Sequence, residues 1–439
     1  GHRFHHPEPM AIAHPGDYPG RLERDGRVVA DFAARRARIR EQVEATAAGV
    51  GGRPDLDPEL LDEVTALTEW PVPVAGTFEE KYLEVPPEAL VLTMKQNQKY
   101  FPLFAEDGAL LNHFITIANV ASPRPEVIRE GNERVVRPRL ADAMFFWEQD
   151  GRRRLEDHLE DLKHVVFQQQ LGTMHAKSER VAELAGHIAD ALEGDPALAR
   201  RAGMLSRCDL MTEMVFEFPE MQGVMGRYQA RRDGEPEELA AAMDEFYMPR
   251  FSGDRVPATP TGIAVALAER IDTLVGIFGI GQRPTGDKDP FALRRAALGA
   301  LRILREHSLP LDLLELLKQA RGHLEEVITE GDAVEAVYAF MVERLKGLYL
   351  EAGTAPDLFD AVAAVRPTRV ADFDHRVQAV AAFRALPEAE ALAAANKRIH
   401  NILRKAGETP GAAPDPELLR DPAERALAEA TESAAADLA

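Results

Sequence analysis

Arginines stand ahead of a run of aromatic residues in one segment of this 439-residue sequence. The segment is GNERVVRPRLADAMFFW, and it contains Arg134, Arg137, Arg139, Phe145, Phe146 and Trp147. Guanidinium groups neutralise phosphates and exposed rings stack on unpaired bases, so the pattern favours a nucleic-acid contact. An aromatic cluster on a helix is equally expected in a hydrophobic core. The sequence leaves both interpretations open.

Two further segments concentrate cations. KDPFALRR contributes Lys288, Arg294 and Arg295, and the stretch 391–407 contains no acidic residue. The candidate RNA-binding residues of that stretch are Lys397, Arg398, Asn401, Arg404 and Lys405. Helical spacing predicts a buried apolar stripe formed by Ile399, Ile402, Leu403 and Ala406, with Lys397, Asn401, Arg404 and Lys405 on a neighbouring solvent face. The helix dipole accounts for cations in the last turns only, and we therefore predict contact with a nucleic-acid backbone.

Four potential metal ligands occur at wide spacing on predicted helices: His175, Cys208, Asp209 and Asp272. Metal-dependent phosphohydrolases of the histidine–aspartate (HD) class present a His, a His–Asp pair and a final Asp from separate helices. Here Cys208 stands where the central His would be, and a thiol suits a hard divalent ion poorly. We predict a degenerate site without metal, in which Cys208 is a small buried hydrophobic residue.

No phosphate-binding loop or catalytic nucleophile is evident. The segment 281–288 is rich in glycine, but its lysine does not directly follow a glycine and no Ser or Thr comes after it. It also follows a predicted helix instead of a strand. We expect a tight interhelical loop with a helix that begins at Pro290. The sequence contains no G-x-S-x-G elbow either.

Composition limits the class of protein. Asp and Glu outnumber Lys and Arg by 73 to 52, so the net charge is −21, which argues against wholesale coating by nucleic acid but permits a local basic groove. A single cysteine excludes a disulfide framework. Glu269, Arg270 and Asp272 interrupt the longest apolar stretch, so no membrane span is expected. We expect a cytoplasmic protein. Because the sequence starts without Met, we also expect a fragment of a longer chain.

The pattern of apolar residues predicts a multidomain α+β fold. Residues 1–164 are expected to form a mixed α/β body with one hairpin, turning at Asp107–Gly108 between KYFPLF and HFITIANV. From there on the spacing is helical. We divide it into a helical domain over 165–300, a helical linker over 301–380, and a final helical module over 381–439.

Several long strings closely resemble the beta subunit of the bacterial tetrameric glycyl-tRNA synthetase, and the resemblance covers essentially the whole chain. They are EVPPEALVLTMKQNQKYFPLF, GNERVVRPRLADAMFFWEQD, VVFQQQLGTM, CDLMTEMVFEFPEMQGVMG, DTLVGIFGIGQRPTGDKDPFALRRAALG and ANKRIHNILRKAG. The family's subunit is longer at both ends. The resemblance therefore implies a fragment that lacks an N-terminal segment and part of the C-terminal domain.

The resemblance implies an α₂β₂ assembly in which the alpha subunit holds glycine, ATP and Mg²⁺ and makes glycyl-adenylate. This chain would carry no cofactor, would bind tRNA(Gly), and would act as the non-adenylating part of a glycine–tRNA ligase. The resemblance also implies that 165–300 is HD-like and that 381–439 begins an anticodon-binding (DALR-like) module. Two alternatives remain: an HD-type metal-dependent phosphohydrolase, and an assembly scaffold without RNA contact.

Overall fold

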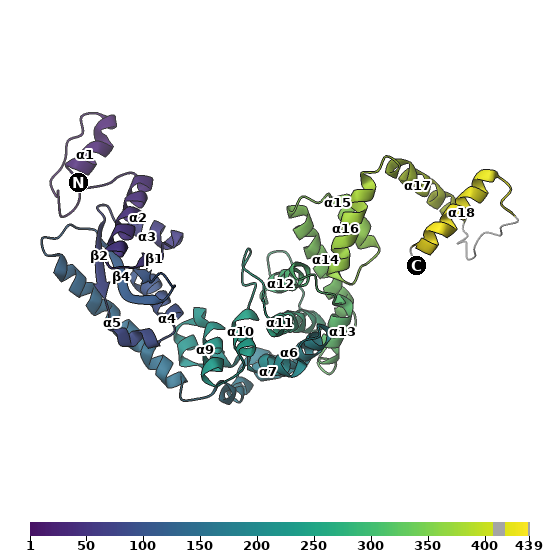
Figure 1. Cartoon of the computed structure of the whole chain (residues 1–439), viewed down its shortest axis with the longest axis horizontal. Coiled ribbons are helices and arrows are strands. Elements are labelled where there is room, and N and C mark those ends of the chain that lie inside the picture. Colours follow the sequence, from purple (N-terminus) through teal and green to yellow (C-terminus); the bar gives the residue numbers. More distant parts are fainter. Residues whose placement is uncertain (407–417, 438–439) are drawn as a thin grey trace. The chain divides into compact units, whose positions relative to one another are not determined.

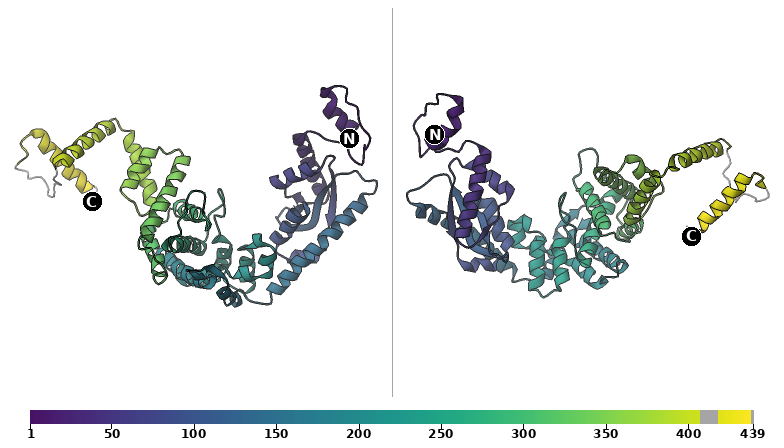
Figure 2. Two further views of the ribbon diagram at one scale, coloured as in Figure 1. Left: turned by 180° about the vertical axis from the view of Figure 1, so that it is seen from behind. Right: turned by 45° about the horizontal axis from the view of Figure 1, so that its top comes forward.

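The computed structural model describes residues 1–406 and 418–437. It divides into two compact units, Gly1–Thr354 with Pro367–Asp372, and Ala355–Arg366 with Phe373–Ala439. Helices predominate, and one small sheet lies in the N-terminal part of the first unit (Figures 1 and 2). The predicted α+β class is confirmed. The HD-like assignment and the boundaries at 164, 300 and 380 stay predictions.

The sheet has four antiparallel strands in the order β1-β3-β4-β2. Their bounds are β1 Arg53–Pro54, β2 Val72–Thr77, β3 Phe101–Phe104 and β4 Leu110–Ala118. The predicted hairpin is confirmed, because β3 pairs with β4 and Phe101 lies opposite Ile115. Gly108 has φ +87, a left-handed conformation that glycine adopts without strain.

Both faces of the sheet are buried. Successive side chains of a strand point to opposite faces, so the adjacent residues Phe114 and Ile115 enter two different cores. Helices α2 (Phe32–Gly49) and α3 (Pro58–Leu67) contribute to the core of Ile115. Helices α4 (Pro87–Leu92) and α5 (Pro125–Asp150) contribute to the core of Phe114, and α5 lies along β2 (Figure 1). The sheet is therefore the middle layer of three.

The core around Phe114 continues into the helical part of the chain. Met214, Val215, Met221 and Met225 pack in the same cluster as the residues of α4 and α5. These methionines follow the predicted boundary at 164 by about 50 residues of sequence. The sheet region and the start of the helical region therefore share one hydrophobic core.

Helix α11 (Pro260–Gly279) is the centre of the helical region. All of its 20 residues are buried except Pro260, Glu269 and Thr273, and it contacts six other helices. These are α6 Met174–Ala191, α7 Pro196–Leu205, α10 Glu237–Glu245, α12 Leu293–Glu306, α13 Leu313–Gly322 and α14 Ala333–Glu351. A helix that is apolar all round must be buried, and α11 is stabilised mainly by this packing.

The remaining elements of the first unit are short. They are α1 Tyr18–Arg24, α8 Glu213–Glu217, α9 Val224–Arg232, a π-helical turn at Thr93–Asn97, and 3-10 turns at Pro15–Asp17, Glu80–Glu84, Leu155–Leu159, Asp161–His164, Cys208–Met211 and Pro219–Met221. A second hairpin, β5 Val166–Gln168 with β6 Gly172–Thr173, was not predicted. Strands of two or three residues are too short to show an alternating pattern.

Helix α12 does not begin at Pro290 as predicted, but at Leu293. The carboxylate of Asp289 accepts hydrogen bonds from the backbone N–H groups of Leu293 (2.8 Å) and Arg294 (2.9 Å). Because these N–H groups have no partner within the helix, the Asp289 side chain fixes the helix start three residues after the proline.

The second unit is helical. Its helices are α15 Pro356–Ala364, α16 Val370–Arg384 from Phe373 onward, α17 Ala389–Ala406 and α18 Pro422–Asp437. Phe359 of α15 and Phe373 of α16 pack with ring centroids 4.8 Å apart, and Arg384 binds Asp357 at 2.7 Å. The helix predicted over 391–407 is confirmed by α17; Gly407 itself lies outside the described residues. No helix within the described ranges has the length and apolar character needed to cross a bilayer.

Candidate nucleic-acid interface

Helix α5 exposes the three arginines predicted to contact nucleic acid. Arg134, Arg137 and Arg139 are all exposed. Arg137 donates from Nε to Oε1 of Glu79 at 2.7 Å, a surface ion pair of little energetic weight. Within the described part of the chain, Arg134 and Arg139 have no carboxylate within ion-pair distance. Two of the three guanidinium groups are therefore available to an external anion.

The three aromatic residues that follow do not all support the same interpretation, nucleic-acid contact or core packing. Phe146 and Trp147 pack against the core around Phe114, and the guanidinium of Arg232 lies 4.1 Å from the ring centroid of Trp147. Phe145 keeps 54% of its surface exposed. The core interpretation therefore holds for Phe146 and Trp147. Only Phe145 presents a ring on which a base could stack.

The second cationic segment lies at the start of α12. Arg294 donates to the carbonyl oxygen of Gly286 and so holds the preceding loop in place. Lys288 is exposed, and its backbone pairs with Thr285 across a tight turn. Arg295 is exposed at the mouth of a cavity. Of these three predicted residues, Arg294 has a structural role within the loop, while Lys288 and Arg295 present their charges to solvent.

The third segment is α17, where Lys397, Arg398, Arg404 and Lys405 are exposed. Asn401 is half-buried, and its Oδ1 accepts a hydrogen bond from Nη2 of Arg404 at 3.1 Å. This contact leaves the charge of Arg404 in place. The acid-free stretch therefore forms a cationic surface on a helix, as predicted.

The apolar stripe predicted to be buried on α17 is exposed instead. Ile399 is 55%, Ile402 57% and Leu403 38% exposed, whereas nothing is described of the Ala406 side chain. Helical periodicity shows that these residues share a face. It does not show that another element covers that face, and within the described residues none does.

The predicted HD positions are occupied by structural contacts. The Asp272 carboxylate receives Nζ of Lys177 at 2.9 Å and Nε of Arg180 at 2.7 Å. Burial favours the neutral acid, but the charges of Lys177 and Arg180 outweigh it and hold the pKa of Asp272 below the usual range. Lys177 is only 1% exposed and lies 4.4 Å from the ring centroid of Phe167. This carboxylate already has two cationic partners.

Cys208 and Asp209 are buried in a short 3-10 turn. The prediction of a buried cysteine is confirmed, and burial raises the pKa of its thiol. Asp209 Oδ2 accepts the backbone N–H of Gly223 at 2.6 Å, while its Oδ1 has no partner among the described residues. Burial is the largest influence on this carboxyl group and raises its pKa to about 6.

His175 faces a different neighbour. Its Nδ1 lies 3.5 Å from Oε2 of Glu179, one turn further along α6. Within the described ranges, no three His, Cys, Asp or Glu side chains are grouped so that they could hold a metal ion. A hard divalent ion therefore does not fit these residues. One acid is bound by two cations, and a thiol stands in place of an imidazole.

Three cations were not among the predicted site residues: Lys177, which is buried, and Arg180 and Arg207, whose side chains are 11% and 13% exposed. Arg207 binds Oε1 of Glu269, and Lys177 lies 3.3 Å from the same oxygen. One signal in the sequence could have led to them. Glu269, Arg270 and Asp272 lie within one turn of an otherwise apolar helix. Buried charges require opposite charges or hydrogen bonds, so partners on neighbouring helices had to exist.

Comparison with known proteins points to one family. The family described as glycyl-tRNA synthetase beta subunit matches residues 1–364. A glycine–tRNA ligase beta subunit of Pseudoalteromonas translucida is 52% identical over 439 residues, which are 100% of this chain and 64% of that protein. The equivalent proteins of Marinobacter nauticus and Pasteurella multocida are 52% and 53% identical, covering 63% and 64% of their own lengths. The chain thus spans just under two thirds of these relatives.

Proposed function

This chain belongs to the glycyl-tRNA synthetase beta subunit family, and from that premise we propose that it binds tRNA(Gly) and positions it for glycylation. The reaction itself is carried out with an alpha subunit, in an α₂β₂ assembly located in the cytoplasm. ATP, Mg²⁺ and glycine bind to the alpha subunit. The role of this chain is therefore recognition and positioning, without a bond-making step of its own.

The observation that carries this proposal is the charge distribution on α17. Its four cations are exposed and the stretch 391–406 contains no acid, although the whole chain has a net charge of −21. An acidic protein repels RNA at long range, so binding requires a local surface where phosphates meet cations without nearby carboxylates. The exposed Arg134 and Arg139 on α5 add two cations without an ion-pair partner among the described residues, on a helix that also exposes Glu130 and Asp142.

The decisive experiment is reconstitution with a separately purified alpha subunit and tRNA(Gly). We expect glycylated tRNA only when both subunits are present, and no exchange of pyrophosphate into ATP by this chain alone. A tRNA with another anticodon and acceptor stem is the control for specificity. Exchange by the alpha-free chain would contradict the division of roles. Glycylation that does not depend on this chain would also contradict it.

The two alternatives predict different results. A phosphohydrolase would release product from a bis(p-nitrophenyl) phosphate probe in the presence of Mn²⁺, which the two cations on Asp272 argue against. A scaffold would co-purify with the alpha subunit but would not increase the retention of tRNA(Gly) on a filter. We expect increased retention, with a steep dependence on salt.

A further inference from the structure

A cavity of about 390 Å³ opens among α11, the start of α12 and the segment that follows α10. Four arginines and a single carboxylate line it, together with aromatic rings. The lining residues that carry the argument are Arg207, Tyr247, Arg250, Glu269, Arg270 and Arg295. We name this cavity the arginine pocket. Only Arg295 among these six residues was predicted to bind RNA.

The charge of the pocket is opposite to that of the chain. Acids outnumber Lys and Arg by 73 to 52 overall, whereas here four guanidinium groups face one Glu269. Oε1 of Glu269 is already bound by Arg207 and lies 3.3 Å from Nζ of Lys177. Glu269 is thus paired with Arg207 of the lining and with Lys177 behind it, and the other three lining arginines have no carboxylate partner in the lining.

Arg270 is a buried cation without a carboxylate partner. Its guanidinium donates only to backbone carbonyl oxygens, including those of Phe246 (2.9 Å), Tyr247 (3.0 Å) and Met248 (2.7 Å). Burial lowers its pKa to about 10, in spite of the nearby Glu269. Carbonyl dipoles satisfy the hydrogen bonds of Arg270 but do not balance its charge. An anion in the pocket would supply the missing negative charge.

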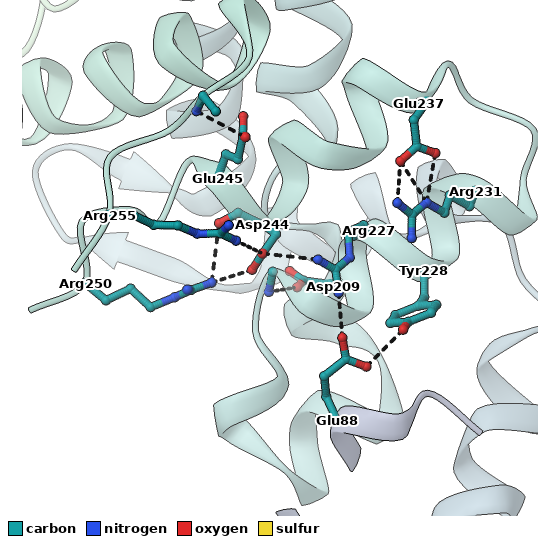
Figure 3. A network of polar contacts seen from close by, with 12 residues as sticks. Glu88, Asp209, Arg227, Tyr228, Arg231, Glu237, Asp244, Glu245, Arg250 and Arg255 are labelled. Atoms are coloured by element: carbon teal, nitrogen blue, oxygen red, sulfur yellow. Dashed lines mark hydrogen bonds and ion pairs between the residues drawn. The ribbon is translucent and has the colours of Figure 1, made fainter. Parts of the chain in front are cut away.

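Arg250 and Arg295 are the most exposed of the four lining arginines. Arg250 binds Asp244, but this carboxylate also faces Arg227 at 3.5 Å and Arg255 at 3.9 Å. Figure 3 shows Asp244 between Arg227 on one side and Arg250 with Arg255 on the other. Arg227 also binds Glu88 at 2.7 Å, so two carboxylates are shared by three guanidinium groups. Arg295 is exposed and has no carboxylate within 4.0 Å among the described residues.

Two donors in the wall lack acceptors. The hydroxyl of Tyr247 and Nε of Arg207 are buried and make no hydrogen bond in the described part of the chain. Oε2 of Glu269 is also without a partner, but it is an acceptor and would repel an anion. Buried donors without acceptors are costly, and they occur where a ligand or water completes the hydrogen bonds. Both atoms lie behind the cavity wall without accessible surface, so the groups that a ligand in the cavity meets most directly are the more exposed guanidinium groups of Arg250 and Arg295.

We propose that the arginine pocket binds a phosphate group. A carboxylate offers two oxygens in one plane, whereas a phosphate presents oxygens in several directions and suits guanidinium groups that arrive from four segments of chain. The cavity is within the size range of ligand sites, so it can admit the group attached to the phosphate. One source is a tRNA phosphate, which rests on the proposed function. The other is a free nucleotide or inorganic phosphate.

The first arm of the test uses inorganic phosphate as the probe. Phosphate is titrated into the full chain by calorimetry at constant ionic strength, balanced with chloride. We expect one saturable site per chain, and about tenfold weaker binding in Arg295→Gln because one charge-assisted contact is lost. Arg250→Gln should weaken binding in the same way. Both side chains are partly exposed, so both variants should fold.

Arg302→Gln is the matched control. Arg302 lies on α12 two turns beyond Arg295, pairs with Glu306 and does not line the arginine pocket. The Arg302→Gln substitution removes the same charge from the same helix, and the affinity for phosphate should remain within about twofold of that of the parent chain. No saturable phosphate binding would overturn the proposal. An equal loss in Arg302→Gln would also overturn it, because the effect would then be one of general charge.

The second arm identifies the source of the phosphate. If the pocket holds a tRNA phosphate, Arg295→Gln weakens binding of tRNA(Gly) and lowers the salt slope by about 0.7 to 0.9. If Arg295→Gln weakens only the binding of inorganic phosphate, the ligand is a free phosphate compound, and the proposal that the arginine pocket binds phosphate is retained. If no form of the chain retains tRNA while phosphate binds, the proposed function fails and the pocket does not. The two failures are therefore distinguishable.

Discussion

Helices α11 and α17 use charged residues in opposite ways. On α11, Asp272 meets Lys177 and Arg180, Glu269 meets Arg207, and Arg270 meets backbone carbonyls, all away from bulk solvent. On α17 the cations are exposed, and the stretch 391–406 contains no acid that could pair with them. The comparison shows that residue type does not decide whether a cation is structural or free to bind. The neighbouring elements decide.

The physical reason is the cost of removing a charge from water. A buried ion must recover its lost hydration from a partner, and breaking such a pair leaves the other charge uncompensated. An exposed cation keeps its hydration and a surface pair adds little. The cations near α11 should therefore affect stability, and those of α17 should affect RNA binding.

The largest effect is expected for Asp272→Ala. The substitution leaves the buried ammonium of Lys177 without its closest acid, so the free energy of unfolding should fall by about 3–5 kcal/mol. Urea denaturation measures it. Asp287→Ala, in the exposed loop before α12, is the control and should change stability by less than about 0.5 kcal/mol. A loss below 1 kcal/mol for Asp272→Ala would mean that water reaches this pair.

The next effect concerns α17. Replacing Lys397, Arg404 and Lys405 by alanine should reduce the slope of log affinity against log salt for tRNA(Gly) by roughly 2 units. Affinity should fall about a hundredfold near physiological salt, while adenylate formation by the alpha subunit stays unchanged. Filter binding across a salt series measures both quantities. An unaltered slope would mean that these cations are merely solvated, and the contrast with α11 would lose its functional meaning.

A smaller effect is expected on the pH dependence of stability. It concerns Asp209, the buried acid without a cationic partner. The pKa of Asp209 is raised from 3.8 to about 6, so the folded state holds more protons than the unfolded state between these values. The parent chain therefore loses stability as the pH rises through this window. Asp209→Asn removes that loss. Its stability relative to the parent should improve by about 1.4 kcal/mol between pH 5 and pH 7.5.

Urea denaturation at the two pH values checks this prediction. Asp272→Asn is the opposite control, because the pKa of Asp272 is lowered. Its carboxylate is stabilising at neutral pH, and that contribution disappears only as the pH falls through its low folded pKa. A constant difference between Asp209→Asn and the parent would show that Asp209 ionises normally.

The smallest effect is expected on the apolar face of α17. Ile402→Ser should change the free energy of unfolding by less than about 0.5 kcal/mol, because the side chain is 57% exposed. Truncating a buried side chain of similar size typically costs 2–5 kcal/mol. Ile271→Ser on α11, at a fully buried position, is the matched comparison. A large loss for Ile402→Ser would mean that the stripe is covered in solution.

Local features of the fold could be predicted where neighbouring residues determine the backbone. The hairpin at Asp107–Gly108 and the helix at 391–407 were both found in this way, because turn chemistry and helical spacing are properties of a short segment. The start of α12 was missed for a local reason. Pro290 suits the first turn of a helix, but the capping carboxylate of Asp289 places the start at Leu293.

The sequence by itself determined the family, the helical character of most of the chain after residue 164 and the acid-free stretch on α17. Tertiary structure decided which charges are free. It placed Lys177 and Arg180 against Asp272, packed Phe146 and Trp147 but not Phe145, and joined four arginines around one cavity. Their partners are separated by tens of residues along the chain. Periodicity shows which face of a helix a side chain occupies, but only folding determines which group lies opposite it.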